Sequence, residues 1–281
     1  MRRGEIPLYL LIIFVVAWWN FSGDDGEVRS PRYTPPSPSQ DYAEPGHKNL
    51  PEPNFRDPEV RIENSGPQRN ATGTAFAVDE SGLWITARHV VDSCNRLGFV
   101  DPGGQRTRRS GQVWLHPNSD MALIEGPKAG AALQLTDNPP KIGADAFHIG
   151  YPQGKPGDVL SQVMGRARMV TRGRYRIDEP VVAYAEKRRY PAFSGSLGGI
   201  SGGPIFNGDG EVIGVSVAES PRRGRVMGTA PRSFQRLFTH AGQRPNAQDI
   251  TAPNMAPSRL VDTGNAMRRG FVVARLLCYA S

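Results

Sequence analysis

Short apolar runs separated by turn residues fill the chain from about residue 66 onward, and they constrain its fold more than any other feature. Glycine, proline or aspartate stands between most of these runs, as expected for strands joined by turns. Many short strands at such intervals predict an all-β barrel or sandwich. The predicted strands are residues 73–78, 83–87, 112–116, 121–125, 145–151, 181–185, 211–217 and 225–230.

Turn chemistry and composition agree with an all-β fold. DESG (79–82) and NGDG (207–210) each lie between apolar runs and predict hairpins. The 281 residues include 32 glycines and 25 prolines, which suit an all-β domain with long loops better than a helical bundle. We expect one short helix in residues 232–238, and a strand or short helix in residues 271–279.

The first residues predict a transmembrane signal-anchor. Residues 6–21 form an uncharged apolar run, close to the lower limit of about 17 residues for a helix that spans a bilayer. The arginines within residues 1–5 would keep this basic start in the cytoplasm, and Trp18 and Trp19 would lie at the far interface. A cleaved signal peptide is the alternative, but no A-x-A-like site follows the run. In both cases the bulk of the chain lies outside the cytoplasm.

Composition divides the rest of the chain into three parts. Residues 22–64 are rich in proline and polar residues and show no sustained apolar period, which predicts a disordered tether of about 40 residues. Residues 65–240 would form the folded domain. Residues 241–281 would be a tail packed on that domain.

The formal charge of +7 and the pI near 9.7 come largely from arginine clusters. QRTRR, GRARMVTRGRYR, EKRR and PRRGR lack the interleaved aromatic residues of nucleic-acid-binding motifs, so no nucleic-acid partner is expected. We expect these clusters on solvated loops, near an anionic membrane surface. No metal and no cofactor are expected, because neither the two cysteines nor the five histidines show zinc-ligand spacing.

One stretch, GGISGGPIFN (198–207), surrounds a single serine, Ser201, with four glycines and a proline. A glycine-rich hairpin is one interpretation. The other is a nucleophile loop, in which the glycines let main-chain N–H groups converge beside the serine hydroxyl, where an oxyanion would form. Because serine is a weak nucleophile, this second interpretation requires a base and a group that orients the base.

His89 and Asp120 are the candidates for these two roles. His89 ends a strand-like run in WITARHVVDSC, and Asp120 precedes one in HPNSDMALIE. Taken alone, His89 could be a structural histidine and Asp120 a turn or cap residue. The order histidine, aspartate, serine is that of chymotrypsin-type hydrolases. The other histidines are weaker candidates because of their positions in the tether, near the domain end or within strands: His47, His240, His116 and His148.

The motifs TARHVV, SDMALIE, HIGYPQG and GGISGGPIFNGDGEVIGV together resemble the trypsin-like serine proteases, and most closely the bacterial high-temperature-requirement (Deg-type) branch. The resemblance covers roughly residues 70–235. It implies two antiparallel six-stranded β-barrels with a catalytic cleft between them. It also implies that His89 is the base, Asp120 its orienter and Ser201 the nucleophile, with the N–H groups of Gly199 and Ser201 as oxyanion hole. Protein or peptide substrates would be the partners.

Some positions depart from the family pattern. Arg88 stands where a small residue is usual, which predicts local crowding beside the base. Ile200 replaces the aspartate that zymogen-type members use for activation, so no such activation is expected. Gly195 at the primary pocket predicts a preference for small or medium apolar side chains, and the resemblance adds a substrate-binding strand at Ser216, Val217 and Ala218. About 40 residues follow the protease-like region, too few for a PDZ domain.

The only two cysteines, Cys94 and Cys278, predict one disulfide bond if the domain lies in an oxidising compartment. The bond would fasten the tail beside the loop that carries His89. Two unrelated buried thiols are the alternative.

The sequence therefore predicts a membrane-anchored serine endopeptidase that acts on envelope proteins. A catalytically silent trypsin-like fold that binds proteins is the first alternative. An enzyme that keeps the triad but hydrolyses esters is the second.

Overall fold

The computed structural model describes residues 48–64, 69–104, 107–220, 223–246, 250–251, 253 and 255–280. The predicted anchor and most of the predicted tether lie outside this part of the chain. Within it, no helix is both long and apolar enough to cross a bilayer. Strands dominate, in agreement with the predicted all-β class.

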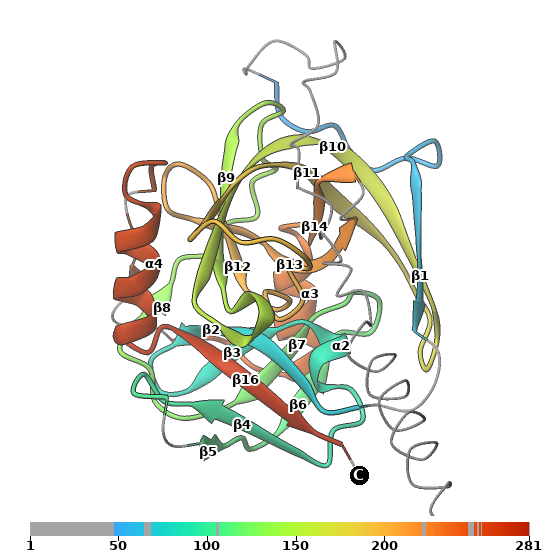
Figure 1. The fold of residues 1–281 in the computed structure, drawn as a ribbon. Coiled ribbons are helices and arrows are strands. Elements are labelled where there is room, and N and C mark those ends of the chain that lie inside the picture. Colours follow the sequence, from blue (N-terminus) through green and yellow to red (C-terminus); the bar gives the residue numbers. More distant parts are fainter. Residues whose placement is uncertain are drawn as a thin grey trace, which may run out of the picture. The chain divides into compact units, whose positions relative to one another are not determined.

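The first sheet has seven strands in the order β5-β4-β16-β2-β3-β7-β6, all paired antiparallel (Figure 1). Its centre is rich in buried aromatic residues: the Trp84 ring lies 5.0 Å from Phe99 and 5.1 Å from Phe271. Its strands are β2 (Ala71–Asp79), β3 (Leu83–Thr86), β4 (Arg96–Val100), β5 (Thr107–Arg109), β6 (Val113–Leu115), β7 (Ala122–Glu125) and β16 (Val273–Tyr279).

The second sheet also has seven strands, in the order β1-β10-β11-β14-β13-β12-β9. Because β9 pairs with β10 as well as with β12, six of the strands close into a ring, and β1 adds to β10 in parallel. The strands are β1 (Glu59–Asn64), β9 (Asp145–Gly150), β10 (Gly157–Gly173), β11 (Ile177–Tyr190), β12 (Pro204–Phe206), β13 (Val212–Ser220) and β14 (Arg225–Thr229). A separate parallel pair joins β8 (Ala132–Leu133) and β15 (Ile250–Thr251).

Four short helical segments accompany the sheets: α2 (Arg88–Val91), η1 (Pro152–Gly154), α3 (Ser233–Ala241) and α4 (Leu260–Arg269). The predicted helix after Pro231 is α3. The tail helix α4 was not expected. Its Arg268 forms a buried ion pair with Asp158 of β10, at 2.7 and 2.9 Å. Gly264 permits this approach, because a Cβ there would lie 2.6 Å from the Asp158 carboxylate.

One predicted boundary is wrong. The tether was expected to run to residue 64, but residues 59–64 form strand β1, in register with Arg168 to Gly173 of β10. The strand or short helix expected in residues 271–279 is the strand β16, which lies inside the first sheet between β2 and β4. This insertion is why that sheet has seven strands where six were expected.

The arginine-rich stretch GRARMVTRGRYR was expected on a solvated loop, and this is also wrong. Most of it lies on the long β10–β11 hairpin (Figure 1). Along this hairpin arginines occupy the outward positions, and residues such as Ala167 and Met169 point into the core. Arg189, from EKRR, is buried and paired with Glu186.

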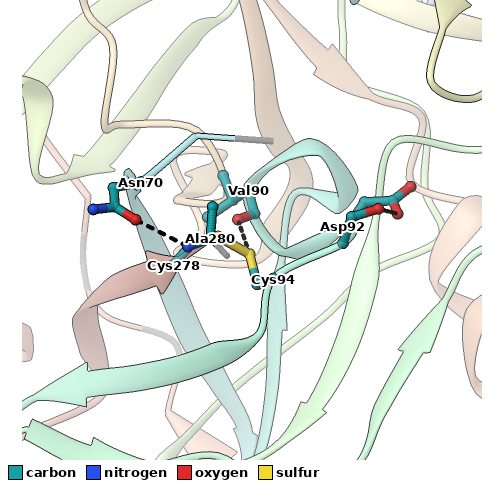
Figure 2. The surroundings of a disulfide bond; sticks show 7 residues. Asn70, Val90, Asp92, Cys94, Cys278 and Ala280 are labelled. Atoms are coloured by element: carbon teal, nitrogen blue, oxygen red, sulfur yellow. Dashed lines mark hydrogen bonds between the residues drawn. A yellow bond between two sulfur atoms is a disulfide. The ribbon is translucent and has the colours of Figure 1, made fainter. Parts of the chain in front are cut away.

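The predicted disulfide bond between Cys94 and Cys278 is present, with a Cα–Cα distance of 5.6 Å (Figure 2). It joins the residues just after α2 to β16 and spans 184 residues of sequence. The Ala280 N–H donates to Asn70 Oδ1 at 2.9 Å close by. The end of β16 is therefore fixed both to β2 and to the segment that follows His89.

We expect the double variant Cys94→Ala/Cys278→Ala to lose about 2–5 kcal/mol of unfolding free energy, because a long closed loop then gains entropy in the unfolded state. Urea denaturation of both proteins without reductant measures the change. Non-reducing peptide mapping of the wild type is the control, and recovery of both cysteines as free thiols would contradict the assignment.

Candidate active site

His89 and Asp120 form a direct pair. His89 lies on α2, which begins immediately after β3, and Asp120 lies in the turn before β7. The His89 Nδ1 is 2.7 Å from Asp120 Oδ2, and the His89 main-chain N–H donates to Asp120 Oδ1 at 2.8 Å. Because a carboxylate can only accept, Nδ1 carries the proton, and the neutral ring presents Nε2 as an acceptor.

The surroundings of the ring set its basicity. Burial by itself lowers the pKa of His89, but the charge of Asp120 and its hydrogen bond outweigh burial, so the pKa lies above its usual value. The nearby Arg174 has a smaller, opposite effect. The His89 side chain remains 29% exposed, whereas that of Asp120 is only 5% exposed. The pair thus has a buried anionic side and a base that remains accessible.

A second carboxylate, Glu179 of β11, supports Asp120 from behind. Its Oε1 accepts the Asp120 N–H at 2.8 Å, and its Oε2 is hydrogen-bonded to the Ser119 hydroxyl. Burial, with a contribution from the charge of Asp120, raises the pKa of Glu179 to about 8. Glu179 is therefore largely protonated at pH 7. No motif in the sequence indicated this residue.

The loop of Ser201 packs against the strands that lead to His89. The Thr74 N–H of β2 donates to the Ser201 carbonyl at 2.8 Å. A Cβ on Gly202, whose φ is +88°, would lie 2.1 Å from the Thr74 carbonyl oxygen and 2.8 Å from the Ala87 nitrogen, two residues before His89. Glycine is required here because the two backbones touch. The structure thus joins His89 to Asp120 and places the Ser201 loop against the entrance of α2.

The predicted oxyanion-hole residues lie in a tight turn. Ile200 N–H donates to Leu197 O at 2.9 Å, and Gly199 has φ +100°. The Gly199 carbonyl accepts from the Thr74 hydroxyl at 2.8 Å. In the described part of the chain, neither the Gly199 nor the Ser201 N–H donates to another residue.

The predicted substrate-binding residues have different surroundings. Gly195 has φ +86°, and its carbonyl accepts from Arg189 at 2.6 Å. Ser216 is buried and engaged: its main-chain N–H and C=O bond to the Ser201 loop at 2.9 and 2.8 Å, so it supports that loop. Val217 is buried, and Ala218 is half-buried on β13.

The competing histidines within the described residues form no hydrogen bond with His89 or with the Asp120 carboxylate. His148 is fully buried between Ser161 and Ser216, at 2.8 and 3.1 Å, and burial lowers its pKa to about 3. Burial likewise lowers the pKa of His116 to about 4. Both are neutral core residues at pH 7. His240 ends α3, and His47 lies outside the described residues.

The crowding predicted at Arg88 does not occur. Its Nε donates to Asp92 at 3.1 Å, and its guanidinium lies 4.5 Å from the centre of the Tyr175 ring. The Tyr175 hydroxyl in turn reaches Asp120 Oδ1 at 3.4 Å. In the described part of the chain, no group of three or more histidine, cysteine or acidic residues could hold a metal ion.

Glu179 has a testable effect on stability. Its pKa is raised in the folded protein from 4.5 to about 8, so the folded state binds more protons than the unfolded state between these values. The unfolding free energy must therefore fall as pH rises through this window. In Glu179→Gln, whose amide mimics the neutral acid, we expect a smaller fall between pH 5 and 8.

Urea denaturation of both proteins across this range measures the difference. His89 also has a raised pKa, so its contribution to the unfolding free energy likewise falls as pH rises. This contribution is present in both proteins and cancels in the comparison. Equal pH dependence in the two proteins would refute the assignment of a neutral Glu179.

Comparison with known proteins identifies the family of this chain. The model of the trypsin-like peptidase domain matches residues 73–215. The chain is 28% identical over 173 residues to Protease Do-like 5, chloroplastic, of Arabidopsis thaliana, covering 56% of this chain and 50% of that protein. It is 29% identical over 186 residues to a probable periplasmic serine endoprotease, DegP-like, of Chlamydia muridarum, covering 66% of this chain and 33% of that protein.

The chain thus spans a third to a half of the length of these relatives. Among solved structures, the active form of the Rv3671c protease from M. tuberculosis aligns with a TM-score of 0.51 at 18% identity, over 73% of this chain and 100% of that chain. That is a likeness of fold. Because the family model matches half of the 281 residues, from Gly73 to Val215, this protein belongs to the trypsin-like peptidase family, with DegP-type serine proteases among its relatives.

Proposed function

We propose that this protein is a serine endopeptidase that hydrolyses peptide bonds through His89, Asp120 and Ser201. The observation that carries the proposal is the 2.7 Å contact between His89 Nδ1 and Asp120 Oδ2, beside a glycine-lined serine loop. Such a pair has the two properties that a weak hydroxyl nucleophile needs: a neutral base and a buried anion that fixes its tautomer.

In the proposed reaction, His89 Nε2 takes the Ser201 proton as Oγ attacks the carbonyl carbon of the scissile bond. Asp120 stabilises the resulting imidazolium, and the N–H groups of Gly199 and Ser201 stabilise the oxyanion. His89 then gives its proton to the leaving amine, which breaks the C–N bond and leaves an acyl group on Ser201. Water, deprotonated by His89, hydrolyses this ester and restores the hydroxyl.

The proposed substrates are proteins or peptides of the bacterial envelope. The periplasmic designation of the DegP-like relatives supports this location. The apolar run at residues 6–21 would anchor the protease domain on the extracytoplasmic side of the membrane. Val217 and Ala218 would line the substrate strand, and Gly195 would leave room for a small or medium apolar side chain.

A fluorophosphonate probe tests the proposal. We expect it to label the wild type at Ser201, as identified by peptide mapping, and to leave Ser201→Ala unlabelled. Ser110→Ala, directly after β5, is the matched control and should label fully. Wild type that is folded but neither labels nor cleaves casein would favour a silent binding module, and cleavage of small esters alone would favour an esterase.

Asp120→Asn gives a second test. Asparagine leaves Nδ1 without a carboxylate and favours the wrong tautomer, so we expect kcat to fall by about 10⁴-fold with little change in KM. Steady-state kinetics on a peptide substrate measures this effect. A loss of less than tenfold would remove Asp120 from the proposed triad.

A further inference from the structure

The orientation of one peptide group decides whether the Gly199 amide can serve the proposed reaction. Residues 197–200 form a turn closed by the bond from Ile200 N–H to Leu197 O. The φ of +100° at Gly199 is that of a type II turn, where type I would need about −90°. Conversion to type I would turn the Gly198–Gly199 peptide over and exchange the directions of its N–H and C=O.

Gln153, at the centre of η1, holds this peptide in its present orientation. Its main-chain N–H donates to the Gly198 carbonyl. The C=O and N–H of a trans peptide point in opposite directions, so this bond directs the Gly199 N–H away from Gln153. A flipped peptide would lose the bond.

The side chain of Gln153 fixes the segment that leads into the turn. Its Nε2 donates to Ser194 O at 2.9 Å and to Ser196 O at 3.0 Å. Together with the main-chain bond, one residue holds three carbonyls of five consecutive residues. No motif in the sequence pointed to this role, because glutamine at a turn is unremarkable.

The backbone of Gln153 is held in turn by the first sheet. Gln153 has φ +54°, a left-handed value that is uncommon outside glycine. Arg275 of β16 donates to the Gly154 carbonyl at 2.9 Å, and Tyr151 N–H donates to the Thr74 hydroxyl at 3.0 Å. These bonds fix η1 on both sides of Gln153, which is therefore pre-organised to receive the turn.

Among the described residues, no other group is hydrogen-bonded to the Gly198 carbonyl or to the Gly199 N–H. Arg189 binds the Gly195 carbonyl, and Glu219 accepts the Leu197 N–H at 2.7 Å, so both act before the Gly198–Gly199 peptide. Ile200 follows it, but this residue is apolar and 4% exposed, and it offers no charge or hydrogen bond from its side chain.

We propose that Gln153 is a positioning residue that keeps the Gly199 N–H directed at the reacting carbonyl, an inference that rests on the proposed peptidase function. Gln153 does not touch the substrate. It acts by disfavouring the flipped turn, in which the Gly198 carbonyl would face the developing oxyanion and repel it.

Gln153→Met tests this role, because methionine keeps the length of the side chain and removes both of its hydrogen bonds. We expect kcat on a peptide substrate to fall about 10- to 100-fold with KM within about twofold, less than the loss of an oxyanion donor itself. Gln153→Gly keeps the main-chain N–H and suits the positive φ, and it should show a similar kcat loss. Gln153→Asn, which retains the amide and tolerates positive φ, should recover part of the activity.

Gln162→Met is the matched control. Gln162 lies on β10, and its side-chain amide also donates to a main-chain carbonyl, that of Gly143, at 2.7 Å. We expect this variant to keep wild-type kcat. Thermal denaturation of all variants ensures that rates are compared between folded proteins.

A tetrahedral transition-state analogue separates positioning from general structural support. The inhibition constant of a peptidyl trifluoromethyl ketone should rise in Gln153→Met by the same factor as kcat/KM falls, whereas the Kd of the product peptide should not change. An unchanged inhibition constant, or a rise in KM alone, would overturn the inference. Wild type that fails to label at Ser201 would instead defeat the proposed function itself.

Discussion

The arrangement of the site depends on the hydrogen bonds of one residue, Thr74. This buried residue of β2 donates its N–H to Ser201 O and its hydroxyl to Gly199 O, and the same hydroxyl accepts from Tyr151 N–H. Thr86 of β3 bonds to its carbonyl. A buried polar group left without a partner costs about 1–3 kcal/mol of stability. Moving any of the segments that bond to Thr74 would therefore destabilise the fold. The bonds of Thr74 fix the Ser201 loop, the turn at residues 197–200 and η1 to the first sheet, which leads into α2.

Two carboxyl groups, those of Asp120 and Glu179, lie next to each other beneath His89. Two carboxylates that are both buried and adjacent cannot easily be ionised together, so one of them is kept neutral. Here the pKa of Glu179 is raised to about 8 by burial, with a contribution from Asp120, and Asp120 faces His89. The two groups come from different sheets, Asp120 from the edge of β7 and Glu179 from β11. Contact between the two sheets therefore brings the two acids together.

Local patterns in the sequence were sufficient to predict the all-β class and the helix α3. The contact of His89 with Asp120 was predicted from their order along the chain and the family resemblance, and the disulfide bond from the presence of only two cysteines. Local patterns could not predict the neighbours of each strand. The apolar run at residues 271–279 predicts a strand or a short helix, but nothing in it indicates β2 and β4 as partners. Strand β10 was missed because its outward arginines suggested a loop. Glu179 and Gln153 were missed because their roles arise from contacts between segments far apart in sequence.

The interior position of β16 also has a consequence for the order of events during synthesis. Leu276 pairs with Gly73 on one side and with Phe99 on the other, so the sheet that carries His89 stays incomplete until β16 has been made and has inserted between β2 and β4. Strands that are far apart in the sequence pair slowly, because a long loop must be closed before their contacts can form. Arg275, on the same strand, also supports η1. The first sheet and η1 therefore gain their full support only when β16 has inserted between β2 and β4.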